Sequence, residues 1–131
     1  MSKGSISKFV MTIAVAVAVA IAVQFAFGPV AGAAGLLGDA AKGQTVYKTY
    51  CMPCHGEKGL GDGPAGAALN PKPRNFTDGA YMKGLTDEYM IKVITEGGSA
   101  VGKTPLMAPW KGTLKDQEIK DVAAYVRAFA K

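Results

Sequence analysis

Two cysteines and a histidine stand within the segment Cys51-Met52-Pro53-Cys54-His55, and the chain has no other cysteine or histidine. On one helical turn, Cys51 and Cys54 lie on the same side, so both thiols can form thioethers with the two vinyl groups of one porphyrin. His55 follows directly, and its imidazole can bind the iron as an axial ligand. This C-x-x-C-H pattern predicts the covalent attachment of one haem c per chain.

Two other kinds of site use similar residues and fit less well. A structural zinc site needs four ligands, more than the cysteines and the histidine of this chain provide. A thioredoxin-type redox pair belongs near a βαβ pattern. Here no run of β-branched residues surrounds the cysteines, and Tyr47 and Tyr50 precede them at helical spacing. Haem attachment is therefore the favoured interpretation.

The amino-terminal residues have the composition of an export signal. Lys3 and Lys8 precede an apolar stretch over residues 9–27, and Ala31-Gly32-Ala33 supplies the small residues that a signal peptidase reads. The stretch is longer than the usual signal core and approaches the length of a membrane helix. An export signal that is cleaved is favoured, and an uncleaved membrane anchor remains the alternative.

We therefore predict two parts, an export signal or anchor over residues 1–33 and a haem domain over residues 34–131. A c-type haem is attached on the oxidising side of a membrane. The export signal and the haem motif therefore both predict an exported, periplasmic protein. If residues 9–27 are not cleaved off, they would anchor it to the inner membrane. The whole chain has 15 basic and 10 acidic residues. Because Lys3 and Lys8 belong to the first part, the domain is only weakly basic and nucleic-acid binding gains no support.

The apolar spacing in the second part predicts three main helices, over residues 39–50, 86–96 and 115–130. Asp39 and Thr86 are the expected N-caps of the first two. Residues 55–84 contain repeated glycine and proline, which predicts a long loop wrapped over the haem. The predicted fold class is all-α, with long loops that enclose one covalently attached haem.

An electron carrier also needs a ligand on the other face of the iron, and the chain has no second histidine. Met107 is the favoured candidate because it lies in a loop held by Pro105 and Pro109, between the second and third helices. Met82, in the looser loop, is the main alternative. An iron site without a methionine ligand would be open to small molecules.

From about residue 39 onward the chain resembles the bacterial class I monohaem cytochromes c. The resemblance rests on motifs spread along the domain: Gly43 and Tyr47, Cys51-Met52-Pro53-Cys54-His55-Gly56, Gly61-Asp62-Gly63-Pro64, Leu69-Asn70-Pro71-Lys72-Pro73-Arg74-Asn75-Phe76, Met107-Ala108-Pro109-Trp110 and Tyr125.

The resemblance implies that the first and last helices cross where Gly43 and Tyr47 meet Tyr125. It also implies that a methionine before the last helix is the distal ligand, which matches Met107. Ala108 departs from the family pattern, in which proline often follows that methionine directly.

Three further haem contacts are expected. The resemblance implies that a proline carbonyl accepts the proton on His55 Nδ1, and Pro71 is the candidate. Arg74 or Trp110 could bind a haem propionate. The alternative for these two is a solvated arginine and a packing tryptophan.

Two strings match nucleotide-binding patterns but lack their context. Residues 61–66 fit G-x-G-x-x-G, and residues 97–104 fit the phosphate-loop pattern. Neither follows a predicted strand, and Pro64 and Pro105 interrupt the helix that should come next. Nucleotide binding is therefore not expected.

The sequence as a whole predicts a one-electron carrier between redox proteins rather than an enzyme. Lys58, Lys72, Lys103 and Lys111 could steer an acidic partner toward the haem edge. Two alternatives remain: a fixed haem subunit of a membrane-bound oxidoreductase complex, and an open-site haem sensor or peroxidase.

Overall fold

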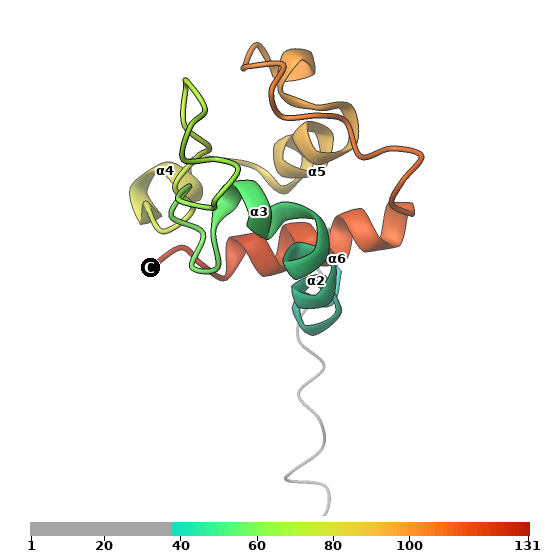
Figure 1. Ribbon diagram of the computed structural model, residues 1–131. Helices are drawn as coiled ribbons and strands as arrows, with labels where there is room; N and C mark the ends of the chain where they lie inside the picture. Colours follow the sequence, from blue (N-terminus) through green and yellow to red (C-terminus); the bar gives the residue numbers. More distant parts are fainter. Residues whose placement is uncertain (1–37) are drawn as a thin grey trace, which may run out of the picture. The chain divides into compact units, whose positions relative to one another are not determined.

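The structure is a computed structural model, and it describes residues 38–131 (Figure 1). The apolar stretch over residues 9–27 and the expected boundary after residue 33 lie outside these described residues, so both stay predictions. Among residues 38–131, no helix combines the length and the apolar character needed to cross a membrane.

The attachment segment ends a continuous helical run. This run consists of α2 (Ala40–Val46), the π-helix η1 (Tyr47–Cys51) and α3 (Met52–His55). As expected, Asp39 caps α2, where its carboxylate accepts a hydrogen bond of 2.9 Å from the Ala41 amide. In η1 the spacing widens, since the Met52 amide donates to the Tyr47 carbonyl. π-turns of this kind are frequent at functional sites.

The two later helices begin close to where the sequence predicts. Helix α5 (Asp87–Glu96) is capped by the Thr86 hydroxyl, which accepts from the Tyr89 amide at 3.1 Å. Helix α6 (Asp116–Arg127) starts after Lys115, whose amide donates to the Glu118 carboxylate at 2.8 Å. The all-α fold class is confirmed, and the only bridge pairing in the described residues joins Lys111 and Leu114.

Three details differ from the prediction. The glycine-rich segment contains a short helix, α4 (Gly79–Lys83), which begins where the Asp78 side chain accepts from the Tyr81 amide. A 3-10 turn, η2 (Gly98–Val101), follows α5. Helix α6 ends at Arg127, before the predicted residue 130. Both added elements are shorter than two turns, so they carry no apolar periodicity that the sequence could reveal.

Helices α2 and α6 pack against each other (Figure 1). Their backbones meet at Gly43, as the resemblance implies. A β-carbon on Gly43 would overlap the Asp121 carbonyl and lie 2.8 Å from the Val122 amide nitrogen. One turn later Tyr47 is 1% exposed, and its ring centroid lies 5.2 Å from that of Tyr125. The predicted glycine and aromatic contact is therefore confirmed.

A buried carboxylate fixes the start of α2 on α6. Asp121 is 4% exposed and accepts a 2.7 Å hydrogen bond from the Asp39 amide and a 2.9 Å bond from Gln117. The Gly38 amide donates to the Lys120 carbonyl beside it. The chain is thus joined to α6 at the point where the described residues begin.

The opposite end of α6 holds the segment between α4 and α5. The Arg127 guanidinium donates to the carbonyls of Met82 and Leu85 and forms a 2.7 Å ion pair with Asp87. These bonds connect residues that are more than 39 positions apart in the chain. They position one wall of the cavity described below.

Replacing Gly43 with alanine should destabilise the domain. The added methyl group would meet the α6 backbone, which cannot move aside as a flexible side chain can, so the two helices must separate. We expect this to lower the free energy of unfolding by about 1–3 kcal/mol. The free energy of unfolding of the haem-loaded protein in denaturant measures this cost. Gly84→Ala is the matched control, because a β-carbon there lies 3.4 Å from its nearest neighbour. Equal stability of the two variants would contradict the close crossing.

Candidate functional site

A cavity of about 570 Å³ lies between the attachment turn, the α4 and α5 helices, α6 and the loop that follows η2. Its volume is within the roughly 300–1,000 Å³ usual for cofactor sites. Most of the side chains around it are apolar, as a porphyrin requires. Those that helices α4, α5 and α6 contribute are Tyr81, Met82, Tyr89, Met90, Val93, Ile94, Val122 and Val126.

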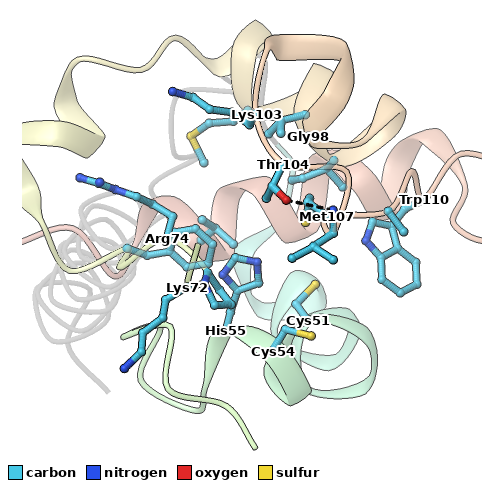
Figure 2. Close-up of a pocket in the computed structure, with 18 of the residues that line it drawn as sticks. Cys51, Cys54, His55, Lys72, Arg74, Gly98, Lys103, Thr104, Met107 and Trp110 are labelled. Atoms are coloured by element: carbon cyan, nitrogen blue, oxygen red, sulfur yellow. Dashed lines mark hydrogen bonds between the residues drawn. The ribbon is translucent and has the colours of Figure 1, made fainter. Parts of the chain in front are cut away.

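Cys51 and Cys54 line this cavity together, and both are free thiols (Figure 2). They are half-buried on the turn from η1 into α3. Burial raises the pKa of the Cys51 thiol to about 12, and the nearby Cys54 adds to this effect. At neutral pH the Cys51 thiol is therefore protonated, and neither cysteine forms a disulfide.

His55 also lines the cavity, and its imidazole stacks on the ring of Phe76. The two ring centroids are 4.5 Å apart and the planes differ by 17°. Burial lowers the pKa of His55, and the nearby backbone of Arg74 opposes this effect. The net shift favours neutral imidazole, which is the form that binds a metal.

The buried nitrogen of His55 is Nδ1, and it has no hydrogen bond of good geometry in the described part of the chain. The sequence predicted that the Pro71 carbonyl would accept its proton. Pro71 lines the cavity as expected, and its contact with Nδ1 stays a prediction. The Phe76 amide bonds to the Gly59 carbonyl at 2.7 Å, which fixes the chain just after Arg74.

The glycine-rich loop wraps over the attachment turn through main-chain hydrogen bonds. The Gly61 amide donates to the His55 carbonyl at 2.9 Å, and the Gly63 amide donates to the Cys54 carbonyl at 3.2 Å. Ala65 bonds in the same way to Pro53 at 2.8 Å. Main-chain amides within residues 61–66 thus provide hydrogen-bond donors for the carbonyls at the end of the helical run.

Tyr47 fastens the same turn from the core side. Its hydroxyl donates a 2.7 Å hydrogen bond to the carbonyl of Gly56, the residue directly after His55. Burial is the main cause that raises the pKa of Tyr47 well above its ordinary value. The phenol is therefore neutral, and it links the helix crossing to the histidine.

Met107 approaches the cavity from the loop after η2, while Cys51, Cys54 and His55 enter from the attachment turn (Figure 2). The Met107 carbonyl accepts a 2.9 Å hydrogen bond from the Gly98 amide. Met82 lines the cavity too, but it is 1% exposed and belongs to the packed core. The structure therefore brings both candidate thioethers to the cavity, one on a loop and one in the core.

The two candidate propionate residues stand at the cavity wall with other contacts. Arg74 pairs with Asp78 at 2.8 Å, and its guanidinium lies 3.4 Å from the centroid of the Tyr81 ring. The Trp110 ring packs edge-on against Tyr50 at 5.4 Å. Both residues therefore border the cavity, and their binding of a haem propionate stays a prediction.

The four lysines named above do not form one group. Lys72 and Lys103 line the cavity, and both are exposed. Lys58 and Lys111 are exposed but lie outside the cavity lining. If lysines at the cavity attract an acidic partner, Lys72 and Lys103 should therefore contribute more than Lys58 and Lys111.

Two free thiols, a neutral imidazole and a thioether thus surround one apolar cavity, and this donor set fits a covalently attached haem. Such a combination of an all-helical fold and a C-x-x-C-H turn defines a c-type haem domain. The sequence matches the family model described as "Cytochrome c" over residues 40–130. The chain belongs to the cytochrome c family, and the resemblance to monohaem cytochromes c is confirmed.

Relatives of two kinds share this domain. Cytochrome c-554(547) of Halothiobacillus neapolitanus is 33% identical, over 68% of this chain and 94% of its own length. The Cbb3-type cytochrome c oxidase subunit FixP of Bradyrhizobium diazoefficiens is also 33% identical, over 70% of this chain. The match spans only 28% of that oxidase subunit.

Solved structures agree with the fold. A c-type cytochrome named KustC0563 matches 68% of this chain and 98% of its own, with 31% identity and a TM-score of 0.53. A chain of the Kuenenia stuttgartiensis reducing HAO-like protein complex Kustc0457/Kustc0458 has 34% identity and a TM-score of 0.56. That match covers 70% of this chain and 43% of the other.

Sequence reasoning missed several residues that hold the site. Phe76 stacks on the imidazole, and its only sequence signal was an aromatic residue within the glycine and proline loop. The bond from Tyr47 to Gly56 and the contacts of Arg127 had no signal, because their partners are fixed only by the fold.

Tyr47→Phe should change how stability depends on alkaline pH. The pKa of Tyr47 is raised above the value of about 10 that an unfolded tyrosine has. The stability gained from the neutral phenol is therefore complete below pH ~10 and is lost as the pH rises through the folded-state pKa. At neutral pH the variant should lose about 1 kcal/mol with the hydrogen bond to Gly56.

Unfolding in denaturant between pH 7 and 11 tests this expectation. The stability of the native protein should fall more steeply above pH ~10 than that of Tyr47→Phe, so the two curves converge. Parallel curves across this range would show that the Tyr47 phenol does not contribute to the alkaline loss.

Proposed function

We propose that this domain is a one-electron carrier whose haem is attached through Cys51 and Cys54 and bound axially by His55 and Met107. The observation that carries the proposal is the shared cavity, into which the attachment turn and the Met107 loop both project (Figure 2). When bound, the haem supplies an iron that alternates between the ferric and ferrous states.

The residues of the chain keep the site unchanged during electron transfer. Phe76 fixes the plane of the His55 ring, and the Tyr47 bond to Gly56 fixes the turn that carries this ring. Apolar side chains from α5 and α6 line the cavity and would shield a bound haem from water. A thioether ligand in an apolar site raises the reduction potential.

Two kinds of redox partnership are consistent with the relatives. Cytochrome c-554(547), of which the chain covers 94%, supports an independent carrier. The FixP oxidase subunit and the chain in the reducing HAO-like complex support a second candidate, a fixed haem subunit within an oxidoreductase complex. Under both, the domain passes electrons to another redox protein and transforms no substrate itself.

The proposed site of action is the periplasm. Haem attachment needs reduced thiols on the oxidising side of a membrane, and the composition of residues 1–33 is that of an export signal or anchor. The mass of the mature protein distinguishes cleavage from anchorage.

The axial ligand is tested by Met107→Leu, with Met82→Leu as the matched control. Both changes remove one sulfur and nearly conserve volume. The oxidised native protein should show the weak far-red sulfur-to-iron band, which Met107→Leu loses and Met82→Leu keeps. The reduction potential of Met107→Leu should fall, by on the order of 0.1 V within the roughly 0.8 V range that axial ligands span.

Three results would contradict this assignment. Loss of the band in Met82→Leu alone would make Met82 the ligand. Retention of the band in both variants would exclude both residues. Absence of the band from the native protein, with ready binding of carbon monoxide after reduction, would favour the sensor or peroxidase.

Charge reversal tests the lysines at the cavity entrance. Lys72→Glu and Lys103→Glu should slow the reaction of the reduced protein with anionic ferricyanide at low salt and speed the reaction with a cationic cobalt complex. Lys58→Glu makes the same change of net charge away from the cavity and should act less. Each effect should fade at high ionic strength. Equal effects at Lys58 and Lys72 would indicate net charge alone.

A further inference from the structure

The segment over residues 97–104, which matches a phosphate-loop string, lies against the loop that carries Met107. It follows α5, and it contains η2 and two glycines that touch the later loop. Its main-chain groups bond within the protein, so the string has a role that nucleotide binding does not explain. Figure 2 shows Gly98, Lys103, Thr104 and Met107 together on one side of the cavity.

Gly97 ends α5 and allows the Met107 loop to pass close by. Its φ is +82°, in the left-handed region that favours glycine. A β-carbon there would lie 2.8 Å from the Met107 carbonyl oxygen and 3.0 Å from the Pro109 nitrogen. Any other residue at this position would push the loop away.

Gly98 holds both ends of the loop. Its amide donates to the Met107 carbonyl at 2.9 Å, and its own carbonyl accepts from the Lys103 amide at 2.9 Å. A β-carbon on Gly98 would overlap the Thr104 carbonyl and lie 3.3 Å from the Met107 β-carbon. Gly98 is buried and is itself part of the cavity wall.

The remaining turns of the loop are fixed by one side-chain and one main-chain hydrogen bond. The Thr104 hydroxyl accepts from the Leu106 amide at 3.2 Å. Beyond Met107, the Trp110 amide donates to the Ile94 carbonyl at 3.0 Å, at the end of α5. The loop is therefore held at the end of α5 in two places, by the bond from Gly98 to Met107 and by the bond from Trp110 to Ile94.

We propose that Gly97 and Gly98 are positioning residues for Met107, which they hold through close backbone packing and the Gly98 amide. This inference rests on the proposed function, in which Met107 binds the iron. It accounts for Ala108, since a proline directly after the methionine would restrict the same stretch of backbone through its fixed φ. Here the contact with the glycine pair supplies that restriction.

The test uses Gly98→Ala in the haem-loaded protein and measures imidazole binding to the ferric form. Imidazole can reach the iron only when Met107 leaves, so its apparent affinity follows the population of the open loop. Gly98→Ala should bind imidazole about tenfold more tightly, because the added β-carbon pushes the loop away and weakens the hydrogen bond between the residue-98 amide and the Met107 carbonyl. The far-red band should weaken while the haem content stays the same.

Alanine at position 98 adds steric contact but no backbone strain, because Gly98 is not among the described glycines that have a positive φ. Gly84→Ala is the control and should bind imidazole like the native protein. Thr104→Val keeps both glycines and removes the hydroxyl bond to Leu106, so it should raise imidazole affinity by a smaller factor, about fivefold. Gly97→Ala, whose β-carbon would lie 2.8 Å from the Met107 carbonyl oxygen, takes the place of Gly98→Ala if that variant does not fold.

Comparison with Met107→Leu separates the two possible failures. If the native protein binds imidazole as tightly as Met107→Leu does, Met107 is not a ligand and the proposed function fails. If the native protein resists imidazole and the two loop variants resist it equally, Met107 is a ligand but the glycine pair does not position it. That result overturns this inference alone.

Discussion

The backbone of α2 meets the backbone of α6 at Gly43, and the position of the haem-attachment turn depends on that contact. Because no side chain separates the helices there, Tyr47 one turn later is buried against Tyr125. From this buried position the Tyr47 hydroxyl reaches Gly56 and fixes the residue after His55. The Tyr47 side chain thus connects the helix crossing to the turn that carries His55.

The cavity lies within the core of the domain. Met82, Met90, Ile94, Val122 and Val126 belong both to the packed core and to the lining of the 570 Å³ cavity. A domain of this size buries a smaller fraction of its surface than a large domain does, so a cofactor or cross-link that adds to its core contributes much to stability. A haem held by two thioethers would complete that core, so the attachment chemistry and the stability of the fold are linked.

Local signals in the sequence were sufficient for the three main helices and the attachment turn. Thr86 caps α5 as expected, and Cys51, Cys54 and His55 line one cavity because their spacing already places them on one turn. Gly43 could be expected at a close crossing because a glycine inside a helix is otherwise unfavourable.

Contacts between segments far apart in the chain could not be predicted from the sequence. Arg127 binds the carbonyls of Met82 and Leu85, and such main-chain partners have no residue type that a pattern could reveal. Likewise, the Arg74 backbone opposes the lowering of the His55 pKa by burial, and only the folded loop brings that backbone near the imidazole. The glycines at 97 and 98 matched a nucleotide pattern, and only their neighbours in space indicate their role.

The central claim is that one haem, closed on both faces by residues of this chain, exchanges single electrons. The most direct test is a potentiometric titration of the haem-loaded protein, followed in its visible spectrum, under argon and again under carbon monoxide. The account predicts a single one-electron transition with the same midpoint under both gases. A midpoint that rises under carbon monoxide would show that the reduced iron is open to ligands, and it would contradict the account.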